Sequence, residues 1–139
     1  MISLSVDRKN RVRDSLINLR ENGKAVLNFL QPNQDNAHLV EDTCKPIPRN
    51  ESEWEAFSID ALESNHLIMK DASMAIEAEV VAEHDLPEAK ACLVVLRLTQ
   101  LIVPGEHLPN ESVHLLCQHG LNRLMATPTA WDHNIDSNV

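Results

Sequence analysis

The stretch ASMAIEAEVVAEHDLPEAKACLVVLRLTQLIV, residues 72–103, carries the clearest β-strand pattern in the chain. Its first part, residues 72–83, alternates apolar and polar side chains with the period of two of a half-buried strand. The apolar members of this alternation are Met74, Ile76, Ala78 and Val80. Its last part, residues 91–103, is rich in leucine and valine, and a turn is expected around residues 85–88. The stretch therefore predicts a long antiparallel hairpin in a mainly β fold.

The first thirty residues predict a strand, a helix and a second strand. The segment ISLSV, residues 2–6, alternates with period two. From Val12 onward, apolar residues recur at helical spacing until Gly23, which follows an asparagine and is typical of a helix C-terminus. KAVLNFL, residues 24–30, then has the composition of a buried strand, and Pro32 ends it.

Weaker patterns occupy the middle and the end of the chain. Residues 35–44 predict a short helix with Asp35 at its N-cap. Residues 54–67 fit either a short helix or a strand. A helix is also expected at residues 111–125, capped by Asn110, because apolar residues recur there at helical spacing. These apolar residues are Val113, Leu116, Leu121 and Leu124.

Length and composition indicate one ordinary globular domain. The chain has 139 residues, of which 43% are hydrophobic, enough for a single core. We expect a domain at residues 1–125 followed by a polar tail at residues 126–139. The net charge of −9 and the four aromatic side chains argue against binding to nucleic acid.

The same sequence features predict a cytoplasmic protein. No charged and then apolar leader begins the chain, and the longest apolar run, residues 91–96, is far too short to cross a bilayer. The three cysteines are odd in number and show no CxxC spacing, so reduced thiols are expected. No membrane partner is predicted.

Positive charge gathers at the N-terminus of this acidic chain. Residues 1–24 hold six of the twelve lysines and arginines and only three acids, so this segment carries +3 and the remainder −12. A strand that leads through an arginine-rich turn into a helix presents backbone N–H groups and guanidinium groups to one point, which favours a phosphate. The alternative is a solvated helix start with no ligand. The candidate phosphate-binding residues are Arg8, Asn10, Arg11, Arg13, Asp14 and Ser15.

Catalytic side chains and metal ligands are not predicted anywhere in the chain. The segment HLLCQH, residues 114–119, places only one His–Cys pair at helical spacing. The alternating glutamates of residues 51–55 are most simply a solvated face. Cys92 lies in a strongly apolar strand and is expected to be a buried core thiol.

The segment ISLSVDRKNRVRDSLINLRENGKAVLNFL, residues 2–30, resembles the flavin reductase-like, FMN-binding split-barrel family. In that family a strand ends in a polar or basic turn, a Lys-Asp-Thr-like element opens a helix, and a strand with a Val-Asn-like pair follows. Arg13, Asp14 and Ser15 stand where the Lys-Asp-Thr-like element stands, and Leu27-Asn28 matches the pair. A looser resemblance continues to about residue 108.

This resemblance implies a split β-barrel of antiparallel strands with flanking helices, paired as a homodimer. It implies FMN as cofactor and NAD(P)H as electron donor, with hydride transfer to the flavin as the reaction. Relatives usually carry a further strand and loop, ahead of the strand that corresponds to residues 2–6, that lie against the isoalloxazine ring. The domain is therefore expected to be N-terminally incomplete.

Two other functions stay open at this point. One is a degenerate split barrel that keeps the dimer surface and serves as a non-catalytic interaction or scaffolding module. The other is an FMN oxidase of the pyridoxamine-phosphate-oxidase type on a similar barrel. The sequence does not choose between NADH and NADPH, and it does not identify the electron acceptor.

Overall fold

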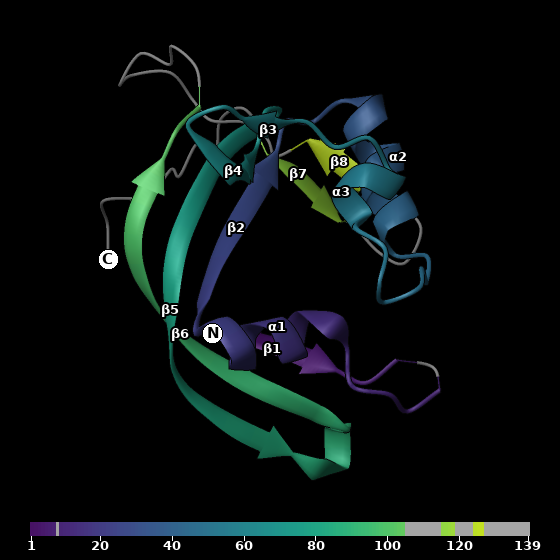
Figure 1. Cartoon of the computed structure of the whole chain (residues 1–139), viewed down its shortest axis with the longest axis vertical. Coiled ribbons are helices and arrows are strands. Elements are labelled where there is room, and N and C mark those ends of the chain that lie inside the picture. Colours follow the sequence, from purple (N-terminus) through teal and green to yellow (C-terminus); the bar gives the residue numbers. More distant parts are fainter. Residues whose placement is uncertain (8, 105–114, 119–123, 127–139) are drawn as a thin grey trace, which may run out of the picture.

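A curved antiparallel sheet forms the centre of the protein. The computed structural model describes residues 1–7, 9–104, 115–118 and 124–126. The sheet has the strand order β1–β6–β5–β2. Its strands are β1 (Ile2–Ser5), β2 (Lys24–Leu30), β5 (Ala72–Leu86) and β6 (Ala91–Ile102). The long β5 and β6 curl into half of a barrel (Figure 1), which confirms the predicted mainly β fold.

The long hairpin is confirmed, with a shorter turn than expected. Pairing continues to the end of β5, where Leu86 faces Ala91, so residues 85 and 86 belong to the strand. A 3₁₀ turn at Pro87–Ala89 closes the hairpin, and Lys90 follows it with a left-handed φ of 48°. The pairing of β5 with β6 shifts register between Glu77 and Ala78 and between Val80 and Ala82, and such irregularities bend a strand.

One edge of the sheet is only partly covered. β1 pairs with the beginning of β6, from Ala91 to Val94. The rest of β6, from Val95 to Ile102, has no partner strand on that side among the described residues. Leu98 and Leu101 on this stretch are 61% and 62% exposed.

Helix α1 (Asp14–Asn22) connects β1 to β2 inside the curve of the sheet (Figure 1). The predicted helix is confirmed, and it ends where expected. Gly23 has a left-handed φ of 67°, and its N–H donates to the carbonyl of Leu19 at 2.8 Å. Leu16 and Leu19 pack with Cys92 and Val94 in the core. Cys92 is therefore buried as predicted, and this burial raises the pKa of its thiol.

A second group of elements packs near the other end of β2. It contains α2 (Gln34–Thr43), α3 (Glu53–Ala56), β3 (Ala61–Leu62) and β4 (Asn65–Met69). The segment 54–67, which fitted helix or strand, thus contains both. The expected N-cap of α2 is wrong, because Asn33 caps this helix and Asp35 lies in its first turn. The Asn33 side chain accepts a hydrogen bond from the N–H of Asn36 at 2.8 Å. Asp35 lies inside the first turn of the helix, so its side chain does not take this capping position.

Asn28 attaches β4 to the main sheet. Its side-chain Nδ2 donates to the carbonyl of Leu67 at 3.0 Å, and its Oδ1 accepts from the N–H of Met69 at 2.8 Å. β4 pairs along its own length with the short β3. The two hydrogen bonds of one β2 side chain therefore help to hold the β3–β4 hairpin on the sheet.

The helix expected at residues 111–125 is wrong within the described residues. β7 (Leu116–Gln118) and β8 (Leu124–Ala126) pair as antiparallel strands instead. The pairing of these two neighbouring strands replaces a helical pattern that Gly120 interrupts, since glycine is a poor helix former. Asn110, Val113 and Leu121 lie outside the described residues, as does nearly all of the predicted tail at 126–139.

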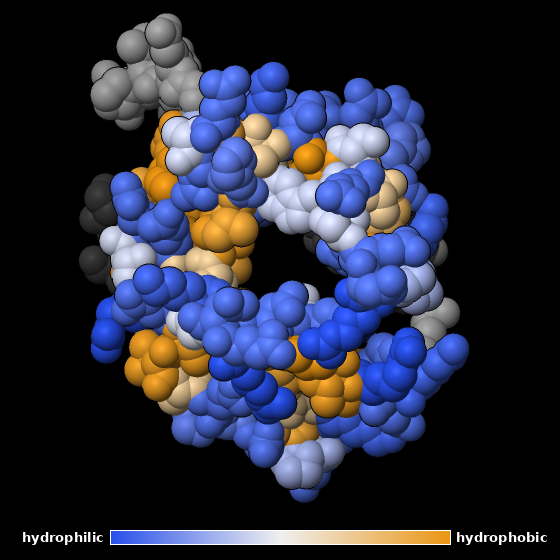
Figure 2. All heavy atoms as spheres, viewed as in Figure 1, coloured by the Kyte–Doolittle hydropathy of each residue, from blue (hydrophilic) through white to orange (hydrophobic). Residues whose placement is uncertain are grey.

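The elements gather into two lobes that share the sheet. One lobe holds β1, α1 and the tip of the long hairpin, and the other holds α2, α3 and the short strands (Figure 1). The space-filling view shows an opening between them (Figure 2). No helix in the described part of the chain is long and apolar enough to cross a membrane.

Candidate anion-binding site

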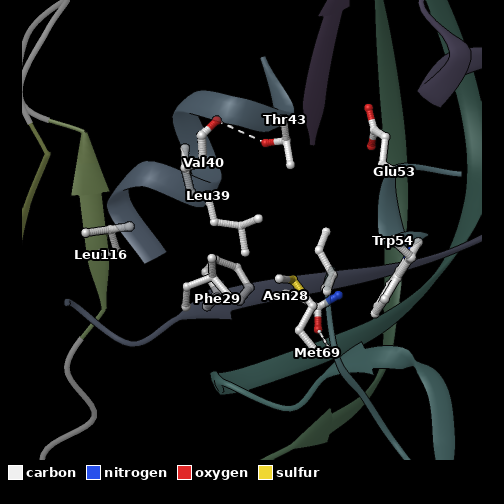
Figure 3. Close-up of a pocket in the computed structure, with 11 residues that line it drawn as sticks. Asn28, Phe29, Leu39, Val40, Thr43, Glu53, Trp54, Met69 and Leu116 are labelled. Atoms are coloured by element: carbon white, nitrogen blue, oxygen red, sulfur yellow. Dashed lines mark hydrogen bonds between the residues drawn. The ribbon is translucent and has the colours of Figure 1, made fainter. Parts of the chain in front are cut away.

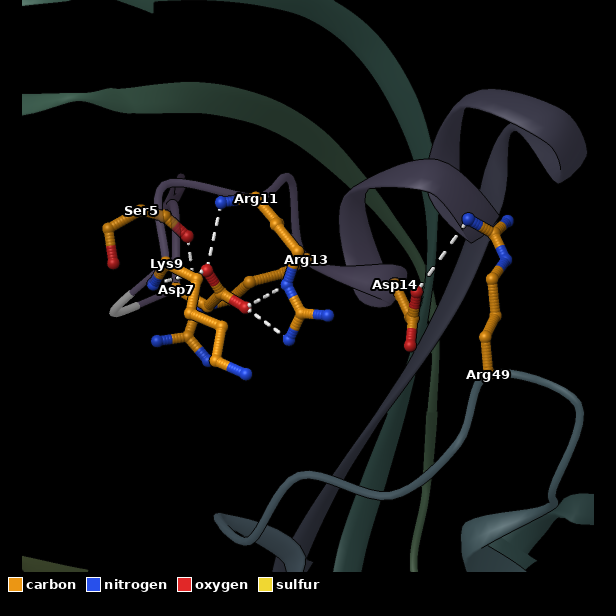
Figure 4. Close-up of polar contacts among 7 residues, drawn as sticks. All are labelled: Ser5, Asp7, Lys9, Arg11, Arg13, Asp14 and Arg49. Carbon is orange, nitrogen blue, oxygen red and sulfur yellow. Dashed lines mark hydrogen bonds and ion pairs between the residues drawn. The ribbon is translucent and has the colours of Figure 1, made fainter.

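The described residues of the basic turn between β1 and α1 gather around the carboxylate of Asp7. One carboxylate oxygen of Asp7 accepts from the backbone N–H groups of Lys9 and Arg11, each at 2.8 Å. The other accepts from the Nε of Arg11 at 2.8 Å (Figure 4). These bonds, above all that from the Arg11 N–H, hold the pKa of Asp7 below its usual range. Asn10 closes the turn with a left-handed φ of 59°.

The tip of the long hairpin lies against this turn. The N–H of Val6 donates to the carbonyl of Lys90 at 3.0 Å. The Nζ of Lys90 donates to Oδ1 of Asn10 at 3.2 Å. Arg13, at the end of the turn, contacts β1, because its Nε donates to the carbonyl of Ser5 at 3.0 Å. Beside them lies a cavity of about 320 Å³, lined by β1, by the hairpin tip and by Arg13, Leu16 and Arg20 along α1.

Two of the three cationic side chains that line this cavity form no ion pair within the described residues. Arg13 and Lys90 line it, together with Arg20 and Asp85. Arg20 is already paired, since its Nε lies 2.9 Å from a carboxylate oxygen of Glu83. Asp85 is the one carboxylate in the lining. Arg13 and Lys90 therefore leave the cavity with an excess of positive charge.

The N-terminus of α1 adds backbone donors beside Arg13. Arg13 is the N-cap residue, and its side chain makes no capping bond. The N–H groups of Leu16 and Ile17 donate to the carbonyl of Arg13 at 3.1 and 3.3 Å. Those of Asp14 and Ser15 make no hydrogen bond within the described residues, as is general for the first turn of a helix. Such free N–H groups favour an anion.

The structure separates the six predicted residues into distinct surroundings. Arg13 lines the cavity, and Asn10 contacts it through Lys90. Arg11 is engaged by Asp7. Asp14 lies 3.7 Å from the guanidinium of Arg49, in the loop before α3 (Figure 4). The side chain of Ser15 is exposed in the first turn of α1, and Arg8 lies outside the described residues.

Lys90 is the residue that sequence reasoning missed. It lies 80 residues from Asn10 and in no recognisable motif. The pairing of Ser5 with Ala91 brings it beside the turn. The sequence predicted the hairpin that carries Lys90 at its tip. It did not predict the register of β1 on β6, which determines which tip residue reaches the turn.

Within the described residues, no group of three or more His, Cys, Asp or Glu side chains is arranged to hold a metal ion. His114 and His119 of the segment HLLCQH lie outside the described part, and Cys117 lies in β7. Of the predicted solvated glutamates, Glu51, Glu53 and Glu55 are all exposed.

Residues 1–124 match the sequence pattern of the flavin reductase like domain. Because this match covers most of the chain, the protein belongs to the flavin reductase-like family. The resemblance inferred from the sequence is thereby confirmed. Membership implies a flavin-related redox role and a flavin cofactor. A comparison with curated proteins finds no match.

Solved structures with the same fold come from several bacteria. Nitrilotriacetate monooxygenase component B from Bacillus cereus superposes with a TM-score of 0.73 at 16% identity, over 94% of this chain and 69% of that one. A "putative flavin reductase with split barrel domain" from Shewanella frigidimarina NCIMB 400 has a TM-score of 0.69 at 15% identity, over 84% and 63%. Flavoredoxin of Desulfovibrio vulgaris (Miyazaki F) has a TM-score of 0.69 at 11% identity, over 97% and 74%.

These structural similarities identify the fold as a split barrel. At sequence identities of 11% to 16%, they establish the fold alone. The matched region spans between 63% and 74% of the length of the three proteins.

Proposed function

We propose that the protein binds FMN, with the phosphate held at the start of α1 beside the cavity. The observation that carries the proposal has two parts. Arg13 and Lys90, which form no ion pair within the described residues, line one cavity, and the N–H groups of Asp14 and Ser15, which directly follow Arg13 at the start of α1, make no hydrogen bond within those residues. Guanidinium groups and helix N-termini both favour a dianionic phosphate. The cavity is small, so the flavin ring would extend beyond it toward the opening between the lobes.

The predicted residues take different parts in this proposal. Arg13 and the hydroxyl of Ser15 would contact the phosphate directly. Asn10 would orient Lys90, and Arg11 would keep the turn in shape through Asp7. Asp14 would leave its backbone N–H to the phosphate while Arg49 compensates its carboxylate. Arg8 completes the proposed set from the sequence.

The proposed activity is hydride transfer from NAD(P)H to the bound flavin. A bound flavin supplies the redox chemistry, and the protein supplies binding and orientation. This agrees with the lack of a predicted catalytic acid or base. Support comes from the family and from the description of one neighbour as a flavin reductase.

A homodimer is part of the same proposal. Within the described residues, no strand pairs with the outer edge of β6 from Val95 to Ile102, and the exposed Leu98 and Leu101 lie on this stretch. Such an edge favours pairing with another strand. We place the protein in the cytoplasm, where its three free cysteines would stay reduced.

Flavin binding is tested by titrating the purified protein with FMN and with riboflavin, which lacks the phosphate. The double variant R13A/S15A should weaken FMN binding roughly ten- to a hundredfold, because it removes charge-assisted contacts to the phosphate. Riboflavin binding should change little. The matched control K70A/S64A alters two exposed residues away from the turn and from the β6 edge and should bind FMN like the wild type.

Equal FMN affinity in the wild type and in R13A/S15A would overturn the phosphate site. Oxidation of NADH or NADPH with added FMN then tests the reductase activity. Tight FMN binding with turnover of a pyridoxamine phosphate substrate would instead identify an oxidase. A chain that binds no flavin but forms a stable dimer would identify the non-catalytic module.

A further inference from the structure

A second cavity lies in the other lobe, away from the phosphate-binding turn. It has a volume of about 380 Å³, is partly open to solvent, and is lined by residues of the end of β2, α2, α3, β4 and β7. Figure 3 shows Trp54 on one side of it and Leu39 and Phe29 on the other, with Met69 near the floor. A volume of this size and an apolar, aromatic wall are usual for small-molecule sites.

The polar groups of this cavity are nearly all engaged. Both side-chain atoms of Asn28 are bonded to the backbone of β4. The hydroxyl of Thr43 donates to the carbonyl of Val40 at 3.0 Å. Glu53 and Trp54 are the exceptions, since neither the exposed carboxylate of Glu53 nor the indole N–H of Trp54 has a hydrogen-bond or ion-pair partner in the described part of the chain. A ligand in this cavity therefore meets largely apolar walls, one N–H donor and one available negative charge.

The surroundings of the cavity strengthen that negative charge. Residues 31–64 contain eight acidic and two basic side chains, a net charge of −6. Both bases are already paired, Lys45 with Asp42 and Arg49 with Asp14. The summed field of such a lobe attracts cations and repels anions.

We propose that this cavity binds a planar aromatic cation. The flat ring would pack between Trp54 and Leu39, and the positive charge would face the carboxylate of Glu53. Aromatic side chains favour a cation over a neutral ring of equal shape, and tryptophan does so most strongly. A phosphate-bearing ligand is disfavoured by the same acidic lobe. The site does not depend on whether the protein binds a flavin.

The test compares 1-methylnicotinamide, a cationic ring, with nicotinamide, its neutral counterpart. The W131F variant leaves Trp54 as the single tryptophan of the chain, so its fluorescence reports on the cavity. We expect saturable quenching with a preference for the cation of roughly fivefold. E53Q should reduce this preference to less than twofold. E55Q removes an exposed carboxylate from the same helix but outside the cavity, and it should keep the preference.

Three outcomes would overturn the proposal. The first is quenching that rises linearly with concentration and never saturates, which indicates collisions rather than a site. The second is equal affinity for the two rings. The third is an equal effect of E53Q and E55Q. Because neither ring carries a phosphate, each of these results leaves the FMN proposal untouched.

Discussion

Removal of the Asn28 side chain should loosen β4 from the sheet. N28A deletes two hydrogen bonds, of 3.0 and 2.8 Å, to the backbone at Leu67 and Met69. The second of these lies in a partly buried position. Each such bond contributes about 1 kcal/mol net, so we expect the free energy of unfolding to fall by about 2 kcal/mol.

Urea denaturation followed by circular dichroism measures this loss. With a typical slope for a small domain, the midpoint should fall by about 1 M and the slope should stay unchanged. The control is N50A, at an exposed asparagine whose side chain makes no hydrogen bond in the described structure, which should stay within about 0.5 kcal/mol of the wild type. A loss in N28A as small as that of the control would refute the assignment of Asn28 as the anchor of β4.

Three further predictions follow from single features. G23A should lower the free energy of unfolding by about 1 kcal/mol, because Gly23 has a φ of 67° with open space around it, and G23N should lose less; urea denaturation of both variants checks the order. D7N should destabilise the protein at pH 7, and this destabilisation should shrink as the pH falls below 3.8: the pKa of Asp7 in the folded protein lies below that value, so its contribution is complete above it and is lost as the pH falls through the lower, folded value. Unfolding curves over a series of pH values test this, and a difference between variant and wild type that does not shrink at low pH would contradict it. L98K/L101K should shift the proposed dimer to monomer in light scattering, whereas V81K, at an exposed valine on β5, should not.

The sequence predicted the elements whose patterns are local. The strand at residues 24–30 has the predicted limits, and α1 ends at Gly23 as expected. The hairpin of residues 72–103 was visible because its alternation is long and its turn contains a proline. In each case the neighbouring residues alone determine the backbone conformation.

Contacts that a charge count or a periodicity does not show explain what was missed. The helix expected at 111–125 gave way to the pairing of β7 with β8, which a single-strand pattern does not reveal. Lys90 reaches the basic turn only through the register of β1 on β6. Engagement of Arg11 by Asp7 was also hidden, since a charge count does not show which cation is already neutralised.

The two lobes carry opposite charge, and this makes their sites separable. The lobe of α1 contains the basic N-terminal segment, while residues 31–64 of the other lobe are strongly acidic. The ion pair between Asp14 and Arg49 joins them, but both side chains are more than half exposed, and such a pair contributes at most about 1 kcal/mol. The shared strands β2, β5 and β6 therefore hold the lobes in place. It follows that R13A/S15A should leave the cation preference of the cavity intact, and E53Q should leave FMN affinity unchanged; coupling between the two sites would show that the lobes move together.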